Sequence, residues 1–241
     1  MQAVILAGGL GTRLRSIVSD KPKPMAEVAG KPFLEYQIEF LRRHKICDFV
    51  LCVGYLHNLI QEYFRDGAPW GVRIKYAVED ELLGTAGAVK NAEKHLQERF
   101  VLLNGDSFFD FDLPALLQFH FLRRSEDRSS VGSIALTEVD DLRSYGAITI
   151  DAHGKILSFD EKNGASKTAK HINAGVYVLE KEVLSFIPPM QKTSLEREIF
   201  PALLQNGKAL SGFATRGFFV DIGTPSGLHA FKHYVLEKTP L

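Results

Sequence analysis

Hydrophobic positions follow two alternating patterns through the first half of the chain. Short apolar runs typical of buried strands lie at 3–6, 49–53, 72–78, 100–103 and 131–137. Between these runs, apolar residues recur at helical spacing over 33–43, 56–64, 86–96 and 113–123. Regular alternation of strands and helices is typical of a parallel sheet covered by helices on both faces. The pattern therefore predicts an α/β fold built on a mostly parallel central sheet.

The pattern changes in the second half of the chain. Strands are predicted at 147–150, 156–159, 172–179 and within 213–220. Thr193 and Glu196 form a capping-box pattern that opens a predicted helix ending at Gln205, and a last helix is predicted from Pro225. No linker rich in Gly, Ser or Pro divides the chain. We therefore expect a single domain over 1–241, with a small β-rich insertion in its second half.

The composition is that of a soluble globular protein and excludes some classes of partner. Hydrophobic residues make up 45% and charged residues 24% of the chain. Lys and Arg total 29, as do Asp and Glu, so the net charge is zero and no global field attracts nucleic acid or a membrane surface. Cys47 and Cys52 lie in an apolar strand-like run, which favours reduced core residues and a cytoplasmic protein. Neither a signal peptide nor a membrane-spanning segment is predicted.

The first predicted strand runs into a glycine loop with cations beyond it. Gly8, Gly9 and Gly11 allow backbone N–H groups to approach phosphate oxygens, and Arg13 offers a planar fork of donors. Lys23 stands between two prolines that bias the backbone towards an extended form. The loop matches neither the dinucleotide fingerprint nor the P-loop pattern. A plain strand-to-helix turn would explain the glycines alone, but the added cations favour a polyphosphate site.

Two aspartates follow predicted strands and are candidate metal ligands. Asp106 lies three positions beyond the apolar run at 100–103, and Asp221 follows another apolar run. In doubly wound sheets, ligands bind at the carboxyl ends of the strands, so both side chains are expected at one edge. Mg²⁺ is usually held by one or two carboxylates together with phosphate oxygens. Asp106 could instead be a turn or capping residue.

These motifs together resemble the signature of the sugar-1-phosphate nucleotidyltransferases, a family whose fold is a three-layer αβα, Rossmann-like arrangement. The resemblance implies transfer of a nucleoside monophosphate from a nucleoside triphosphate to a sugar 1-phosphate, with release of pyrophosphate. It implies catalytic roles for Arg13, Lys23, Asp106 and Asp221, the two aspartates holding Mg²⁺. It also implies a nucleotide-binding half over about 1–138 and a sugar-binding half over about 139–241. The implied nucleotide-binding residues are Leu6, Ala7, Gly8, Gly9, Gly11, Thr12, Arg13, Glu79, Gly84, Thr85 and Asp106.

Glu79 is the residue that the resemblance assigns to reading the nucleobase. It lies five positions before Gly84, in a stretch that packs against the base in the family, although Gly84 and Thr85 could equally serve a turn and a helix cap. A carboxylate only accepts hydrogen bonds. Guanine offers it two adjacent donors, whereas uracil and thymine would face it with carbonyl oxygens. We therefore expect GTP to be preferred over UTP and dTTP.

The resemblance assigns the sugar phosphate to Lys23, Gly146, Glu161, Lys162 and Asn173. Taken singly, Glu161 and Lys162 more often belong to a solvated strand edge, and an asparagine such as Asn173 more often makes a hydrogen bond at a strand end. Within the family the chain is most similar to the D-glycero-α-D-manno-heptose 1-phosphate guanylyltransferases, and next to the mannose-1-phosphate guanylyltransferases. A non-catalytic sensor of nucleotide-sugars could share the fold, and a cytidylyltransferase or molybdenum-cofactor nucleotidyltransferase could share the glycine loop. The sequence leaves open both the sugar and the oligomeric state, a homo-oligomer included.

Overall fold

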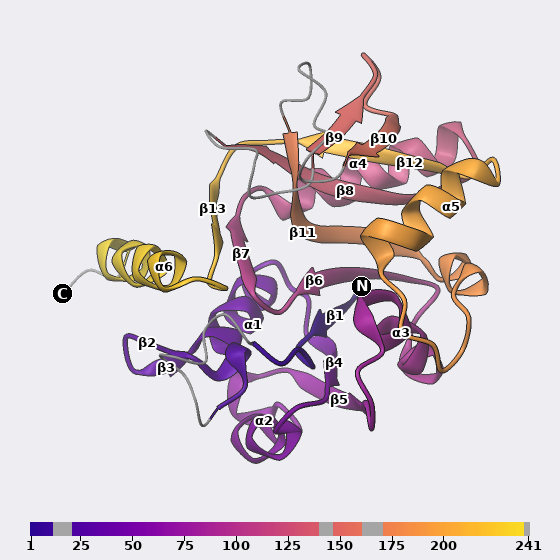
Figure 1. The fold of residues 1–241 in the computed structure, drawn as a ribbon. Coiled ribbons are helices and arrows are strands. Elements are labelled where there is room, and N and C mark those ends of the chain that lie inside the picture. Colours follow the sequence, from indigo (N-terminus) through magenta and orange to yellow (C-terminus); the bar gives the residue numbers. More distant parts are fainter. Residues whose placement is uncertain (12–20, 140–146, 161–170, 239–241) are drawn as a thin grey trace.

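A central sheet of nine strands forms the body of the protein in a computed structural model that describes residues 1–11, 21–139, 147–160 and 171–238. Its first half is parallel and runs in the order β6, β1, β4, β5 (Figure 1). These strands are Arg99–Asn104, Gln2–Leu6, Asp48–Val53 and Arg73–Val78, respectively. All four coincide with predicted apolar runs to within one residue at each end, because buried parallel strands are apolar on both faces.

The second half of the chain extends the same sheet and does not form a separate layer above it. Strand β11 (His171–Glu180) pairs antiparallel with β6 on one side and with β8 (Ser130–Glu138) on the other. Strand β12 (Ala209–Ala214) then pairs in parallel with β8. Among the described strands of this sheet, only β11 and β10 run against the common direction. The prediction of a mostly parallel sheet is thus confirmed.

The antiparallel hairpin of β9 (Ala147–Ile150) and β10 (Ile156–Asp160) continues the sheet beyond the end of β6. Strand β11 is long enough to serve two neighbours along one edge. Its C-terminal part pairs with β6, whereas His171 and Ile172 pair with β9. The hairpin therefore lies past the carboxyl end of β6, on the side where a ligand is expected.

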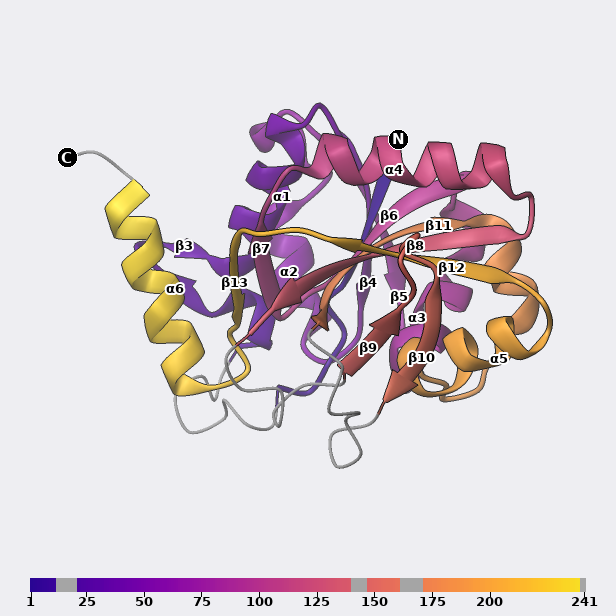
Figure 2. The ribbon, with the colours of Figure 1, turned by 90° about the horizontal axis from the view of Figure 1, so that it is seen from above.

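Helices cover both faces of the sheet and give the three layers that the sequence predicts (Figure 2). One face carries α1 (Phe33–Arg43), α2 (His57–Phe64) and α4 (Leu113–Glu126), and the other carries α3 (Gly84–Asn91) and α5 (Phe200–Gln205). Alternate residues of β1 enter the two apolar clusters, Ala3 and Ile5 on the α1 face and Val4 on the α3 face. This alternation follows from the two-residue period of a strand.

A two-stranded ribbon stands beside the main sheet and carries the last helix. It pairs β7 (Ser107–Asp110) with β13 (Phe218–Asp221), and α6 (Pro225–Lys238) packs against it. Phe231 of α6 is fully buried in the same cluster as α1. The sequence did not predict β7, nor the hairpin of β2 (Glu27–Val28) and β3 (Lys31–Pro32), because such short segments show no clear period.

The predicted capping box at Thr193 is wrong by one residue. Ser194 is the N-cap: its hydroxyl accepts a hydrogen bond from the Arg197 N–H, and its own N–H donates to the Glu198 carboxylate at 2.8 Å. The helix opens with a π-helical turn, Leu195–Ile199, before α5 begins. Glu196 does not accept the backbone N–H that a capping box would give it: its carboxylate accepts hydrogen bonds from the hydroxyls of Ser194, Thr85 and Tyr177.

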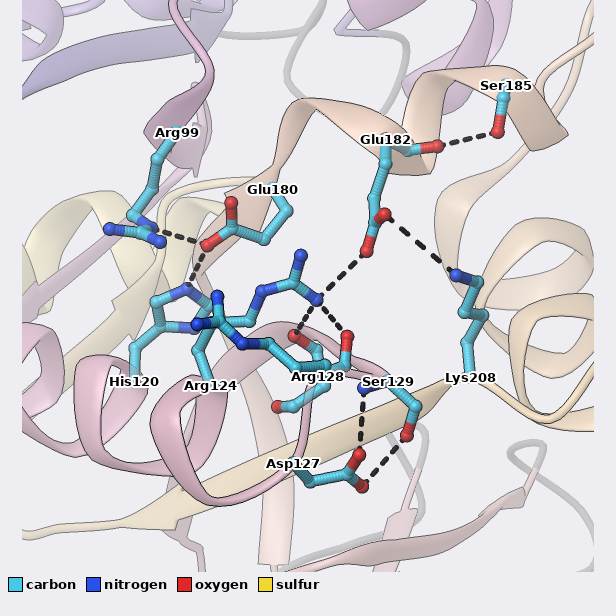
Figure 3. Close-up of polar contacts among 11 residues, drawn as sticks. Arg99, His120, Arg124, Asp127, Arg128, Ser129, Glu180, Glu182, Ser185 and Lys208 are labelled. Carbon is cyan, nitrogen blue, oxygen red and sulfur yellow. Dashed lines mark hydrogen bonds and ion pairs between the residues drawn. The ribbon is translucent and has the colours of Figure 1, made fainter.

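A buried polar cluster braces the end of the sheet opposite the hairpin. Figure 3 shows His120 and Arg99 both meeting the Glu180 carboxylate. His120 of α4 is fully buried, with Nε2 3.0 Å from Glu180 and Nδ1 3.0 Å from Ser133, and Glu180 also pairs with Arg99. Burial lowers the pKa of His120, an effect that Glu180 partly offsets. Although a serine, a histidine and a carboxylate meet here, Ser133 and His120 have no exposed surface, so the cluster joins strands and has no access for a substrate.

Within the described ranges, no helix has the length and apolarity that crossing a membrane requires.

Candidate active site

A cavity of about 970 Å³ opens at the carboxyl ends of β1 and β6. Its walls include the glycine loop after β1, the turn that carries Lys23, the loop after β5 with the start of α3, the β6–β7 turn, the β9–β10 hairpin, Asn173 of β11 and the segment before α5. This is the edge at which doubly wound sheets bind ligands. The predicted site residues on its lining are Leu6, Gly8, Gly9, Gly11, Lys23, Glu79, Gly84, Thr85, Asp106 and Asn173.

Two positions of the glycine loop disfavour any side chain, one by close packing and one by its backbone conformation. A Cβ added at Gly8 would lie 2.7 Å from Oε1 of Glu79, closer than real Cβ contacts. Gly11 has a φ of +58°, which L side chains rarely adopt, and a Cβ added there would lie 3.0 Å from Cβ of Lys23. Ala7, in contrast, is fully buried below the loop, where its N–H donates to the Cys52 carbonyl at 2.7 Å. It supports the loop and does not line the cavity.

The ammonium of Lys23 lies close to the carboxylates of two aspartates beside the β6–β7 turn. Lys23 Nζ lies 2.7 Å from Asp106 Oδ2 and 3.7 Å from Asp221 Oδ1, and its side chain is only 9% exposed. The β7–β13 pairing brings Asp221 opposite Ser107, next to Asp106 in the chain. The Ile222 N–H donates to the Asp106 carbonyl at 2.9 Å, which fixes the two aspartates relative to each other. Sequence reasoning placed both carboxylates at one edge, and the fold brings them to one cation.

The donor set at this point suits a hard divalent cation. Two carboxylates already face one positive charge, and the Asp106 side chain is 41% exposed at the cavity. No group of three or more His, Cys, Asp and Glu side chains meets at one point within the described residues. Magnesium does not need such a group, because it usually keeps several waters and takes the rest of its ligands from one or two carboxylates and substrate phosphates.

Glu79 is a buried carboxylate on the opposite side of the glycine loop. It follows β5 directly, and its Oε2 accepts a hydrogen bond from the Leu83 N–H at 3.0 Å. Burial raises the pKa of Glu79, and the hydrogen bond from Leu83 offsets part of the rise. A carboxylate that is partly satisfied and lines the cavity can still accept hydrogen bonds from a ligand.

Thr85 and its glycine neighbour join α3 to the segment before α5. Gly84 has a φ of +71°, and an added Cβ would lie 2.6 Å from the Thr193 carbonyl oxygen. The Thr85 hydroxyl donates to Glu196 at 2.9 Å and accepts from the Leu195 N–H at 2.8 Å. Its donor is therefore already used inside the protein, and Thr85 can offer a ligand its methyl surface and backbone.

A chain of hydrogen bonds connects Thr85 to the far wall of the cavity. Glu196 also accepts from the buried Tyr177 hydroxyl at 2.9 Å, and Asn173 donates its amide to that hydroxyl at 2.9 Å. The side-chain oxygen of Asn173, Oδ1, accepts from the Gly175 N–H. Sequence reasoning found the two ends of this chain, but not Tyr177 or Glu196, because Tyr177 reads as a core residue and Glu196 as a cap.

Some lining residues carried no motif that could have revealed them. Lys192 and Arg197 add cations from the segment before α5, and Phe159 and Ile148 add an apolar wall from the hairpin. The predicted site residues Thr12, Arg13, Gly146, Glu161 and Lys162 lie outside the described residues.

Comparisons with known proteins agree on the class of enzyme. Residues 2–238 match the model of the nucleotidyl transferase family. The chain therefore belongs to this family and is a nucleotidyltransferase.

Individual relatives match over nearly the whole chain. A D-glycero-alpha-D-manno-heptose 1-phosphate guanylyltransferase from Campylobacter jejuni is 39% identical over 96% of this chain and 98% of its own length. A mannose-1-phosphate guanylyltransferase from Mycobacterium tuberculosis is 36% identical over 93% of this chain, which spans 62% of that protein. The crystal structure of HddC from Yersinia pseudotuberculosis complexed with GMP-PN is similar in fold, with a TM-score of 0.80 and 33% identity over 97% of this chain and 99% of that one.

Proposed function

We propose that this protein is a sugar-1-phosphate guanylyltransferase that makes a GDP-sugar and pyrophosphate from GTP and D-glycero-α-D-manno-heptose 1-phosphate. The observation that carries the proposal is the ion pair of Lys23 with Asp106, two residues on the cavity that Glu79 also lines, with Asp221 close to the same ammonium. The similarity to the heptose 1-phosphate guanylyltransferase of Campylobacter jejuni supports the choice of sugar.

In the proposed reaction, an oxygen of the sugar phosphate attacks the α-phosphorus of GTP. A new P–O bond forms there, and the bond from the α-phosphorus to the bridging oxygen breaks, so that its electron pair leaves with pyrophosphate. Such a transfer needs positioning and charge stabilisation, not a covalent enzyme intermediate. Lys23 stabilises the charge between the two reacting phosphates. On the sequence alone, we assign Arg13 to the departing pyrophosphate and Lys162 to the sugar phosphate.

Asp106 and Asp221 are the residues proposed to hold Mg²⁺. The ion, when bound, neutralises phosphate charge and orients the two phosphates. Lys23 lies against both carboxylates, which keeps their negative charges from repelling each other before the substrates bind. The extended backbone of Pro22, with a ψ of 148°, leads into the turn that carries Lys23 and sets its direction.

Glu79 is the proposed base-reading residue. It lines the cavity next to the glycine loop, so a base bound there presents its edge to a carboxylate. Guanine can donate from both N1–H and the exocyclic amine, whereas uracil and thymine would bring carbonyl oxygens against the charge. An unpaired buried group of this kind costs about 1–3 kcal/mol, and more when it is charged.

A matrix of four nucleoside triphosphates against several sugar 1-phosphates, read by pyrophosphate release with and without Mg²⁺, tests the proposal. We expect the highest kcat/KM for GTP with the heptose 1-phosphate. Faster release with UTP or dTTP would overturn the assignment of Glu79, and the absence of turnover with every pair would favour a nucleotide-sugar sensor.

The second candidate is a mannose-1-phosphate guanylyltransferase, which the similarity to the Mycobacterium tuberculosis protein favours. Mannose and the heptose differ by one carbon in the exocyclic arm, and a difference of one such group is worth only about 1–3 kcal/mol in an apolar pocket. The same matrix separates the two sugars by their kcat/KM ratio.

A further inference from the structure

Gln37 of α1 lies directly beneath the turn that carries Asp106. Its side chain is 1% exposed, and its Nε2 donates to the carbonyl oxygens of Asn104 and Ser107, both at 2.8 Å. These carbonyls belong to the first and last residues of the four-residue β6–β7 turn, of which Asp106 is the third. A single amide group on α1 therefore binds both ends of the turn.

Backbone contacts hold the two middle residues of the same turn. The Gly105 N–H donates to the Leu6 carbonyl at 3.0 Å, and the Ile222 N–H donates to the Asp106 carbonyl at 2.9 Å. These bonds tie the turn to β1 and to the residue after β13. Gln37 ties its two ends to α1, so the four residues of the turn are held by three different parts of the fold.

The same helix supports the cation that faces Asp106. The Phe33 N–H, at the start of α1, donates to the Ala26 carbonyl at 2.9 Å, and the Ala26 N–H donates to the Lys23 carbonyl at 3.0 Å. Both partners of the 2.7 Å ion pair between Lys23 and Asp106 are thus held from one helix.

The side-chain oxygen of Gln37 makes no hydrogen bond within the described part of the chain, which indicates that the residue contributes to the fold through the two N–H donors of its amide. Gln37 Oε1 is buried without a hydrogen-bond partner among the described residues. A buried acceptor without a partner destabilises the folded state, and an apolar side chain of similar volume would avoid that cost. Most residues around α1 on this face are apolar, so an amide stands out here.

We propose that Gln37 is a positioning residue that sets the place of the Asp106 carboxylate for the metal and phosphate groups of the reaction. The proposal deepens the proposed function and rests on it. Metal ligands depend on the groups that orient them, and removing such a group typically lowers metal affinity or activity about 10–100-fold. Gln37 acts through the turn and touches neither substrate.

The test compares Gln37→Met with Gln2→Met, a matched change at another buried glutamine. Gln2 is 5% exposed, and its side chain bonds to the His95 carbonyl and the Gln97 N–H at the amino end of β1, away from the cavity. Both variants remove a bridging amide from the interior. They differ in whether that amide holds the Asp106 turn.

For Gln37→Met we expect the Mg²⁺ concentration at half-maximal rate to rise, and kcat to fall, by about tenfold, with the KM for GTP nearly unchanged. Hydrogen exchange of the backbone amides over 104–107 should also quicken by about tenfold relative to wild type in the absence of metal and substrates. Gln2→Met should change neither quantity, although it lowers the melting temperature. If Gln37→Met does not fold, Gln37→Asn retains an amide that is one methylene too short for both carbonyls and serves the same test.

Equal Mg²⁺ requirements and equal exchange over 104–107 in the two methionine variants would overturn the proposal. Failure of the proposed function is a separate result: wild-type protein that releases no pyrophosphate with any pair of substrates refutes the enzyme assignment. The exchange comparison would still decide whether Gln37 holds the turn.

Discussion

The ammonium of Lys23 lies 2.7 Å from the Asp106 carboxylate, although 83 positions separate the two residues in the chain. Asp221, from the opposite end of the sequence, approaches the same ammonium at 3.7 Å. Three segments far apart in the chain therefore meet around one charge. Their meeting point lies at the carboxyl end of β6, where phosphate groups of a substrate are expected.

Replacing Lys23 should abolish most of the activity. We expect Lys23→Ala to lower kcat/KM for GTP by about 10²–10³-fold, the usual cost of losing one group that stabilises developing charge. Pyrophosphate release measures the effect, and Lys31→Ala is a suitable control because Lys31 pairs with Glu39 and Glu35 outside the cavity. A folded Lys23→Ala protein that retained more than about a tenth of the wild-type rate would exclude a catalytic role.

Neutralising Asp221 should weaken the response to magnesium more than it weakens the fold. Asp221→Asn keeps the shape of the side chain but removes one of the two charges proposed to hold the ion, so the half-saturating Mg²⁺ concentration should rise at least about tenfold. A Mg²⁺ titration of the initial rate measures this.

Asp110→Asn provides the control on the same β7–β13 ribbon. Asp110 lies at the other end of β7, bonded to Tyr234 and Lys238 of α6. Its loss should lower the melting temperature without altering the Mg²⁺ requirement. A similar rise in the half-saturating Mg²⁺ concentration in both variants would mean that this concentration depends on the stability of the ribbon and not on the charge of Asp221.

Changing Glu79 to glutamine should relax the choice of nucleobase. The amide replaces one acceptor with a donor, so it no longer matches the two adjacent donors of guanine and no longer repels a carbonyl oxygen. We expect the ratio of kcat/KM for GTP to that for UTP to fall by about tenfold or more in Glu79→Gln, since one unmatched hydrogen bond costs about 1–3 kcal/mol.

The pH dependence of GTP binding should reflect the protonation of Glu79. Because burial raises the pKa of Glu79, the carboxylate becomes protonated at a higher pH than an exposed glutamate would. The KM for GTP in wild-type protein should therefore rise as the pH falls through that raised pKa, and Glu79→Gln should remove this rise. An unchanged pH profile in the variant would locate the titrating group elsewhere.

The buried cluster around His120 should make stability depend on pH. Burial lowers the pKa of His120, so between that lowered value and the usual 6.5 the unfolded chain binds a proton that the folded protein does not. Stability from this residue is therefore complete above pH 6.5 and is lost as the pH falls below it. Protonation would also place a third positive charge beside those of Arg99 and Arg124.

Melting temperatures measured between about pH 7.5 and about pH 5.5 check this dependence. His120→Gln should lower stability at the higher pH and flatten the profile over this window, because a neutral amide does not titrate. His153→Gln, at an exposed turn, should leave the profile as it is. A wild-type profile that stays flat, or rises towards acid, would contradict the assignment.

Regular periodicity explains why much of the fold could be predicted from the sequence. The bounds of α1 were predicted to the residue, because Leu34, Ile38 and Leu41 mark one buried face. Asp106 and Asp221 were expected at one edge because each follows an apolar run, and the fold brings them together. Gly8 and Gly11 could also be singled out from the sequence, because glycine suits positions where the backbone is closely packed or has a positive φ.

The parts that could not be predicted depend on contacts between distant side chains. Glu196 fits a capping box in the sequence, but its carboxylate bonds to Thr85, 111 positions away, and the cap passes to Ser194. Gln37 reaches across 67 positions to Asn104. No local period records such contacts, because they depend on which helix packs beneath which turn.

The β9–β10 hairpin and the charged groups of the site are attached to different parts of the fold. Its ladder to β11 runs through His171 and Ile172, whereas the Lys23 and Asp106 pair is held from α1 and β1. Substitutions in the hairpin can therefore reshape the apolar wall at Ile148 and Phe159 without moving the charged groups. Relatives that accept other sugars could arise by altering this hairpin, and an engineer could exchange it as a module while the chemistry stays in place.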